Sequence, residues 1–554
     1  PSARRRNVSS IACEAPRQDI AVEKFFNTSG PVKSAWHYCI PPLERMDWAE
    51  IQHLIASERY FVLHAPRQTG KTSALLAIMA ALNAEGRFAC AYANIEGAQA
   101  ARGDETQGIP AVCDVLVDAI ELYLADSVLK AWYKAEKGSI SPQHLLTAVL
   151  QRWAQTTPRP VVLLLDEVDA LIGDTLISLL RQIRAGYAQR PGAFPQSLVL
   201  CGVRDLRDYR MRSADQEVIT GGSAFNIKAV SLRLGNFSPV ETQALWLQHT
   251  TATGQVFDPA IFPELWADSA GQPWLVNALG QEVTWNDRVL RDRQRPVGLE
   301  DYRAGRERLI QSRATHLDQL ADKLKEARVR RVIAALLATD QTELQLPEDD
   351  LQYLVDLGLI ERKPQIHISN RIYQEVIPRE LTAVTQDTMV QDTAWYLRPD
   401  RRLDMARLLA AFQQFFRENG DSWVERFDYK EAGPQLLLQA FLQRIVNGGG
   451  RIGREYALGR RRTDLLVEWP LTPDQGFHGP VQRIVIELKL LHPGKSLAST
   501  LAIGLEQTAD YADRVGAQEA HLVIFNRDPG MDWTDKVWRR EEAHGQRPIL
   551  VWGC

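Results

Sequence analysis

Two short stretches in the first third of the chain carry residue types that can handle phosphate. The first, APRQTGKTS, follows an apolar run and precedes the helix-forming segment ALLAIMAAL. A loop that opens a helix presents backbone N–H groups to an anion, and Gly70 permits the tight approach. Lys71 can then reach the β- and γ-phosphates, and Thr72 can ligate Mg²⁺. These features predict an ATP site, with Ala65 in place of the usual first glycine, whose members are Ala65, Pro66, Arg67, Gln68, Thr69, Gly70, Lys71, Thr72 and Ser73.

The second stretch, VVLLLDEVDAL, places two acids after an apolar strand. We predict that Asp166 belongs to the magnesium shell and that Glu167 orients or deprotonates the attacking water. A strand that simply ends in solvated acids is the alternative, and the phosphate loop upstream weighs against it. A complete strand, 88–95, lies between the two motifs, as in the additional-strand class of P-loop ATPases.

A third set of chemically capable residues lies near the C-terminal end. Glu487 and Lys489 are two apart in the apolar run IVIELKLL, so a strand would present them on one face. Asp464, on the preceding predicted strand, would lie beside them. Two carboxylates form an oxygen site for Mg²⁺, which can polarise a scissile phosphate, while Lys489 positions or activates water. The alternative is an ordinary surface strand with a Glu–Lys pair, and Asp464 favours the metal site.

The order around Asp464 and Glu487 is helix, three strands, helix, strand, and it resembles the PD-(D/E)XK nucleases over about 425–527. The resemblance implies that Glu431 is the acid of the first helix. It also implies that Gln507 and Tyr511 form the Q…Y pattern of nuclease domains that accompany AAA-like ATPases. From the residues themselves, Glu455 is another candidate acid, with a solvated strand residue as its alternative. The predicted hairpin tip carries Arg460, Arg461 and Arg462. Two interpretations stay open for these arginines: they bind backbone phosphates, or they are simply solvated.

The N-terminal motifs also resemble a known family. HYCIPPLERMD, APRQTGKTS, LLLDEVD, GVRDLRDYR, LRLGNFS and GQPWLVNAL are similar to the AAA-like ATPases related to the STAND and origin-recognition ATPases, over roughly 36–380. The resemblance implies that Tyr38 and Arg45 line the adenine site. Arg204 falls at the usual sensor position, where both γ-phosphate contact and a salt bridge remain open. Pro273 matches a lid motif, and a helix-start proline is an equal alternative.

Apolar strands that alternate with helices position the N-terminal motifs. Such strands indicate a parallel sheet covered on both faces, and a helical segment and a winged helix are expected to follow it. The expected fold class is therefore α/β: a P-loop ATPase sheet with a helical lid and winged helix, then a nuclease-like α/β domain. The predicted strands are 60–64, 88–95, 160–166, 197–203 and 229–234. The predicted domains are a tail (1–35), an ATPase core (36–235), a lid (236–305), a winged helix (306–381), a linker (382–400) and a nuclease domain (401–554).

Composition limits the class of protein. A chain of 554 residues needs several cores, and its net charge of −4 argues against coating nucleic acid by bulk charge. Six scattered cysteines without a CxxC pair indicate reduced thiols, as in a cytoplasm, and no apolar run approaches the length of a membrane span. The basic segment KLKEARVRR predicts a helix that touches DNA phosphates or one with a solvated basic face, through Arg328, Arg330 and Arg331.

Two functions from different classes remain. The first is an ATPase module that regulates a Mg²⁺-dependent DNA endonuclease, with ATP and Mg as cofactors, DNA rather than RNA as the favoured partner, and a homo-oligomer expected. By analogy, that arrangement suits phage defence or mobile-element maintenance. The second is a STAND-like signalling or assembly switch whose C-terminal domain binds nucleic acid without cleavage. Intact Asp464, Glu487 and Lys489 favour the first.

Overall fold

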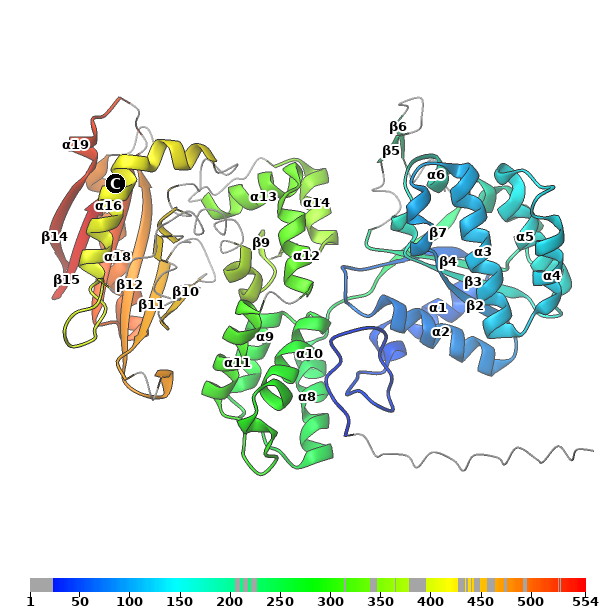
Figure 1. Ribbon diagram of the computed structural model, residues 1–554, viewed down its shortest axis with the longest axis horizontal. Helices are drawn as coiled ribbons and strands as arrows, with labels where there is room; N and C mark the ends of the chain where they lie inside the picture. Colours follow the sequence, from blue (N-terminus) through cyan, green and yellow to red (C-terminus); the bar gives the residue numbers. More distant parts are fainter. Residues whose placement is uncertain are drawn as a thin grey trace, which may run out of the picture.

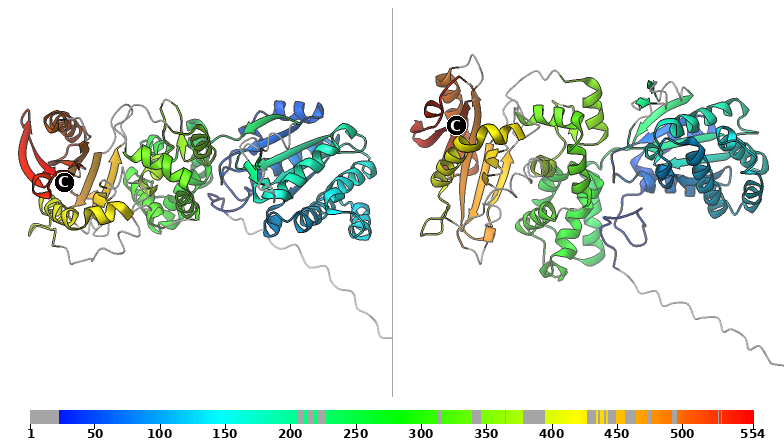
Figure 2. Two further views of the ribbon diagram at one scale, coloured as in Figure 1. Left: turned by 90° about the horizontal axis from the view of Figure 1, so that it is seen from above. Right: turned by 45° about the horizontal axis from the view of Figure 1, so that its top comes forward.

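Three parts of the chain follow one another along the long axis of the molecule. The ATPase core lies at one end and a six-stranded sheet at the other, with helices between them (Figure 1). The views of Figure 2 show the same order from two further directions. The computed structural model describes residues 23–204, 210–212, 218–220, 227–312, 315–338, 346–363, 365–377, 395–426, 434, 437–439, 441–442, 449–455, 464–472, 476–491, 496–526, 528 and 530–554.

The five predicted strands of the ATPase core all form, and they pair in parallel in the order β2-β3-β4-β1-β7. The residues of β1, β3 and β4 are buried, and so are all but the last of β2, because helices cover both faces of the sheet. The described side chains of β7, at one edge, are half-buried or exposed. In the sheet, β4 lies between β1 and β3, the two strands that precede the motifs. The strand predicted at 88–95 lies between these motifs in the sequence, but in the sheet it is an edge strand, β2. The strands are β1 (Tyr60–His64), β2 (Ala89–Asn94), β3 (Val161–Asp166), β4 (Ser197–Gly202) and β7 (Lys228–Arg233).

Two apolar clusters hold the core helices on the sheet. The apolar side chains of α1 and α2 pack on one face, and those of α3 to α6 pack on the other. A separate antiparallel pair, β5 (Arg210–Arg212) and β6 (Val218–Thr220), lies beyond β4 in the chain. The helices are α1 (Trp48–Ala56), α2 (Lys71–Glu85), α3 (Glu105–Leu124), α4 (Ser127–Glu136), α5 (Pro142–Thr156) and α6 (Gly173–Ala185).

Helices dominate the middle of the chain, as expected. Helices α8 to α11 come first, and α12 to α14 and the short antiparallel pair β8–β9 follow them. Residues 371–377 are also helical. Helices with a two-stranded wing are compatible with a winged helix, which stays a prediction. The elements are α8 (Pro239–Thr253), α9 (Ile261–Ser269), α10 (Pro273–Gln281), α11 (Leu299–Gln311), α12 (Thr315–Leu324), α13 (Ala327–Ala338), α14 (Glu348–Asp356), β8 (Ile360–Glu361) and β9 (His367–Ile368). Within the described parts, no helix is long and apolar enough to cross a membrane.

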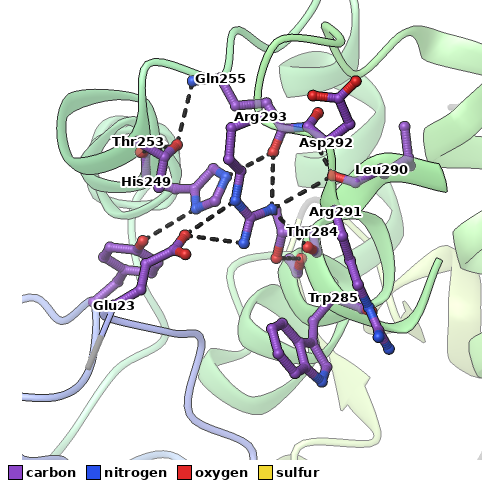
Figure 3. A network of polar contacts seen from close by, with 12 residues as sticks. Glu23, His249, Thr253, Gln255, Thr284, Trp285, Leu290, Arg291, Asp292 and Arg293 are labelled. Atoms are coloured by element: carbon purple, nitrogen blue, oxygen red, sulfur yellow. Dashed lines mark hydrogen bonds and ion pairs between the residues drawn. The ribbon is translucent and has the colours of Figure 1, made fainter. Parts of the chain in front are cut away.

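The segment 23–38 is fastened to these helices by polar contacts. Arg293 is central: its guanidinium pairs with Glu23 at 2.9 Å and donates to the carbonyl of Thr284 at 2.7 Å (Figure 3). Gln255 accepts from Arg293 and shares a 2.8 Å hydrogen bond with His249. The backbone N–H of Val32, within this segment, also donates to the Ser73 hydroxyl in α2. The segment therefore bridges the helical region and the helix that follows the phosphate loop.

The C-terminal sheet has six strands in the order β10-β11-β12-β13-β15-β14. Apolar residues of α16 pack on one face and those of α18 on the other, because residues along β12 alternate between the two clusters. The C-terminal end of the chain adds the strands β14 and β15 to this sheet. The elements are α16 (Met405–Arg426), β10 (Arg451–Glu455), β11 (Asp464–Pro470), β12 (Val481–Leu491), α18 (Leu497–Val515), β13 (Glu519–Asn526), α19 (Trp533–Lys536), β14 (Trp538–His544) and β15 (Arg547–Gly553).

Candidate functional site

The loop between β1 and α2 wraps around the ammonium group of Lys71. Lys71 Nζ donates to the carbonyls of Ala65 and Pro66 at 3.0 and 3.1 Å. Gly70 caps α2 with a left-handed φ of 94°, a conformation that costs glycine little. The loop thus turns sharply and directs the first backbone N–H groups of α2 toward its own concave side, as anion binding requires.

Asp166, at the end of β3, faces the start of α2. The Thr72 hydroxyl donates to Asp166 Oδ2 at 2.7 Å, and the Glu167 N–H donates to Oδ1 at 3.0 Å. A hydroxyl and a carboxylate at this distance are the hard oxygen donors that Mg²⁺ takes. The donor set therefore fits the predicted magnesium site, with Thr72 and Asp166 as the residues that would hold the ion.

Glu167 follows Asp166 in a left-handed conformation, with φ of 58°. This conformation is uncommon for a residue with a side chain and is typical of functional sites. Burial raises the pKa of the Glu167 carboxyl, and the nearby Lys71 opposes that rise. A carboxylate with a raised pKa is a better acceptor of a proton from water, which suits the predicted role.

The two residues expected at the adenine site lie in different places. Arg45 donates to the carbonyls of Thr69 and Gly235 at 2.7 and 2.8 Å, so it braces the phosphate loop. Tyr38 is 1% exposed, and its hydroxyl hydrogen-bonds His249 at 3.1 Å in the core of the helical region. The Tyr38 ring packs edge-on against Phe26 and His249, and its role at the adenine site stays a prediction.

The Arg204 side chain contacts helix α14. Its guanidinium lies 3.9 Å from Asp356 Oδ2 and 4.8 Å from the centre of the Tyr353 ring. Of the two roles left open by the sequence, the salt bridge is the one present here. Pro273 is buried and is the first residue of α10, which agrees with the alternative of a helix-start proline. The side chain of the adjacent Gln272 donates to the Gln68 carbonyl at 3.5 Å.

The basic helix α13 makes intramolecular pairs. Arg331 forms an ion pair with Asp350. Arg328 pairs with Glu326 at 3.3 Å and stacks on the Tyr353 ring at 3.1 Å. These contacts favour a structural role over phosphate binding for both side chains.

In the C-terminal sheet, Asp464 of β11 pairs in register with Glu487 of β12. Glu455 of β10 pairs with Asp464, so three acidic residues occupy one row across adjacent strands. Lys489 forms an ion pair with Glu487, and the two side chains are 5% and 2% exposed. Glu487 and Lys489 alternate along β12 with residues of the α16 cluster, so these two side chains lie on the α18 face.

Other predicted members of this site are placed only in part. Gln507 Oε1, on α18, is buried and has no hydrogen-bond partner in the described part of the chain, and Tyr511 is fully buried nearby on the same helix. Among the described side chains, no three His, Cys, Asp or Glu residues come together as a metal cluster. Outside the described residues lie the 382–393 stretch, Glu431, Arg460, Arg461 and Arg462.

Two residues beside the predicted ATP site were not anticipated. Tyr92 of β2 donates to Asp166 Oδ2 at 3.0 Å, and Cys201 of β4 faces the same carboxylate, with its thiol pKa raised by burial and then by Asp166. Tyr92 is the one polar side chain in an otherwise small and apolar strand, ACAYAN, before its terminal Asn94. A tyrosine in a strand of otherwise small residues was the sequence feature that could have pointed to this contact.

A parallel sheet of this order, with the Lys71 loop after β1 and an acidic pair after β3, is the P-loop ATPase fold. No family model matches the sequence, and no curated protein matches it. Similar solved structures include a Walker-type ATPase of Pyrococcus abyssi, PABY2304, at 13% identity and TM-score 0.43, covering 64% of this chain and 99% of that one.

Two further structures cover similar shares. The Aeropyrum pernix ORC1 protein in complex with DNA is 12% identical, with TM-score 0.33, covering 63% of this chain and 94% of that one. The Thermotoga maritima RuvB Holliday junction branch migration motor is 13% identical, with TM-score 0.31, covering 60% and 96%. Likeness at this level carries no function to the present chain.

Proposed function

We propose that the chain binds and hydrolyses ATP at the loop 65–73. The observation that carries this proposal is the convergence of Lys71, Thr72 and the Asp166–Glu167 pair at the carboxyl edge of a parallel sheet. Lys71 neutralises phosphate charge, and Glu167 accepts a proton from the attacking water or orients it. Magnesium, when bound by Thr72 and Asp166, would supply further charge neutralisation at the phosphates.

The test compares ATP hydrolysis by the full chain with that of Lys71→Ala. We expect Lys71→Ala to lose nucleotide binding and turnover together, since the loop closes around its ammonium. Lys134→Ala on the exposed side of α4 is the matched control and should behave as wild type. Equal turnover by wild type and Lys71→Ala would refute the assignment of this loop.

The C-terminal sheet is, in the same proposal, a Mg²⁺-dependent nuclease site formed by Asp464, Glu487 and Lys489. Its support is the register that pairs Asp464 with Glu487, and the ion pair between Glu487 and Lys489 on one face of β12. Two carboxylates and a lysine can hold a metal and activate water for phosphodiester hydrolysis. DNA is the proposed substrate, and Mg²⁺-dependent nicking of supercoiled plasmid by wild type but not Asp464→Ala tests it.

One observation favours the second function class. Glu487 and Lys489 are almost fully enclosed, so a substrate phosphate reaches them only after part of the domain moves. A nucleotide-controlled switch with a C-terminal domain that binds without cutting needs no such movement. Absence of nicking at any ATP and Mg²⁺ concentration, with plasmid still bound, would select this alternative.

Both functions call for a homo-oligomer. One nuclease site cuts one DNA strand, so cutting both strands takes two copies of the chain, and a switch of the second class acts by assembly. Light scattering of the chain with ATP and with ADP measures that association. A role in phage defence or mobile-element maintenance remains part of the first proposal and rests on analogy with the domain order.

A further inference from the structure

The Tyr92 hydroxyl is a contact of Asp166 that lies outside the roles assigned so far. It donates to Asp166 Oδ2 at 3.0 Å, beside the 2.7 Å hydrogen bond from Thr72 to the same oxygen. The other oxygen accepts the Glu167 N–H. Three donors thus fix the plane of a carboxylate that is fully buried. Removing one donor would leave the carboxylate freer to turn.

The register of the sheet explains why Tyr92 can reach this carboxylate. Tyr92 of β2 pairs with Leu164 of β3, two residues before Asp166. Residues two apart on a strand lie on the same face, so the Tyr92 ring lies on the face of Asp166, toward α2. The phenol then extends along β3 to the carboxylate. Its ring also meets Tyr123 edge-on, with centroids 6.4 Å apart.

The Tyr92 phenol is the donor of this hydrogen bond, and Asp166 Oδ2 is the acceptor. A hydrogen bond to an ionised acceptor is stronger than one between neutral groups.

We propose that Tyr92 is a positioning residue of the ATP site, which holds the Asp166 carboxylate toward Thr72 and thereby sets the affinity for magnesium-bound nucleotide. The inference rests on the proposed function, since it assumes that the loop 65–73 binds ATP. Tyr92 itself contacts neither nucleotide nor metal; it acts through Asp166.

The experiment measures binding of a fluorescent ATP analogue to the full chain, with EDTA and across a magnesium titration. Tyr92→Phe removes only the hydroxyl. We expect its affinity in EDTA to match wild type, and its magnesium concentration for half-maximal enhancement to rise about tenfold, the size of one charge-assisted hydrogen bond. In an Asp166→Asn background, Tyr92→Phe should have no further effect, because its acceptor has lost its charge.

Tyr60→Phe is the matched control. Tyr60 is buried at the amino end of β1, the end of the parallel strands opposite the phosphate loop, and its hydroxyl donates to the Pro195 carbonyl at 2.9 Å. It should lose stability similar to Tyr92→Phe and keep the wild-type magnesium titration. If Tyr92→Phe does not fold, Tyr92→Met, which also lacks the hydroxyl, replaces it and should show the same magnesium shift.

A magnesium shift in Tyr92→Phe that disappears with Asp166→Asn supports the inference. An unchanged titration in Tyr92→Phe, or an equal loss of affinity with and without magnesium, overturns it. Failure of wild type to bind the analogue under any condition refutes the proposed ATP site instead, and so the two failures are distinguishable.

Discussion

Gln68 of the phosphate loop and His316 of α12 share a hydrogen bond of 2.5 Å between Oε1 and Nδ1. The other imidazole nitrogen lies 2.5 Å from the Tyr373 hydroxyl, and the ring stacks on Trp274 at 4.8 Å. Gln68 is held in a left-handed conformation, with φ of 57°. One neutral imidazole therefore connects the phosphate loop with two separate parts of the helical region.

This histidine makes folding stability depend on pH. Burial lowers the pKa of His316 to about 4 from an ordinary 6.5. Between those values the unfolded chain binds the proton and the folded chain does not, so stability is lost as pH falls below 6.5. We expect wild type to lose about 2 kcal/mol more than His316→Gln between pH 6.5 and 5, measured by urea unfolding.

Other histidines with lowered pKa values contribute to both proteins equally, and the difference isolates His316. His53→Gln, at an exposed position of α1, is the control and should follow the wild-type pH profile. Parallel profiles for wild type and His316→Gln would show that the imidazole is not held neutral in the folded state.

Glu167→Gln tests the acid–base assignment at the ATP site. The amide keeps the size of the side chain but cannot accept a proton from water. We expect ATP affinity close to wild type and turnover at least 100-fold slower, as for loss of a general base. Binding by fluorescence and phosphate release separate the two quantities. Equal turnover by both proteins would remove Glu167 from the reaction.

Gly70→Ala tests the shape of the loop. A Cβ at this residue would lie 2.7 Å from Arg45 Nη1, in a backbone conformation with φ of 94° that side chains disfavour. We expect ATP affinity to fall at least tenfold. Gly86→Ala, at the other end of α2, has a similar φ of 74° but nothing within 4 Å of the added Cβ.

Gly86→Ala therefore shares the backbone strain without the collision at the loop. It should lower the melting temperature and leave ATP affinity unchanged. If both variants bind ATP as wild type does, the loop tolerates a displaced Arg45, and its conformation is not what selects the phosphates.

The sequence predicted the strands of both sheets well because local patterns define them. Buried parallel strands are continuous apolar runs, and the motif loops begin where those runs end, so residues such as Lys71 and Asp166 could be placed from spacing alone. The same reasoning paired Asp464 with Glu487, since a hairpin and an alternating pattern leave few choices of register.

Contacts between distant segments could not be predicted in this way. Tyr38 was placed at the site from its position before β1, but its partner His249 comes from α8, 211 residues along the chain. The contacts of Tyr92, His316 and Arg204 are also made with residues far away in the sequence. Nothing local to any one of these residues records which element packs against it, and the order of strands in the sheet, with β4 inserted between β1 and β3, is equally non-local.

The last prediction joins the two ends of the molecule. We expect Asp464→Ala to abolish plasmid cleavage and leave ATP hydrolysis intact, because Asp464 belongs to the C-terminal sheet and Lys71 to α2 on the N-terminal sheet, with helices between the two sheets (Figure 1). Lys71→Ala should change cleavage, although Lys71 lies in α2, apart from the C-terminal sheet. The physical reason is that Glu487 and Lys489 are enclosed, so cleavage requires a rearrangement that nucleotide can control.

The measurement compares plasmid cleavage by wild type and Lys71→Ala, with and without ATP, at one Mg²⁺ concentration. Gating predicts that ATP changes the rate for wild type and has no effect on Lys71→Ala. Lys134→Ala, on α4, controls for the loss of a positive charge in the same domain and should respond to ATP as wild type does. Equal cleavage in all four conditions would mean that the two domains are only tethered, and the ATPase would then need a different output.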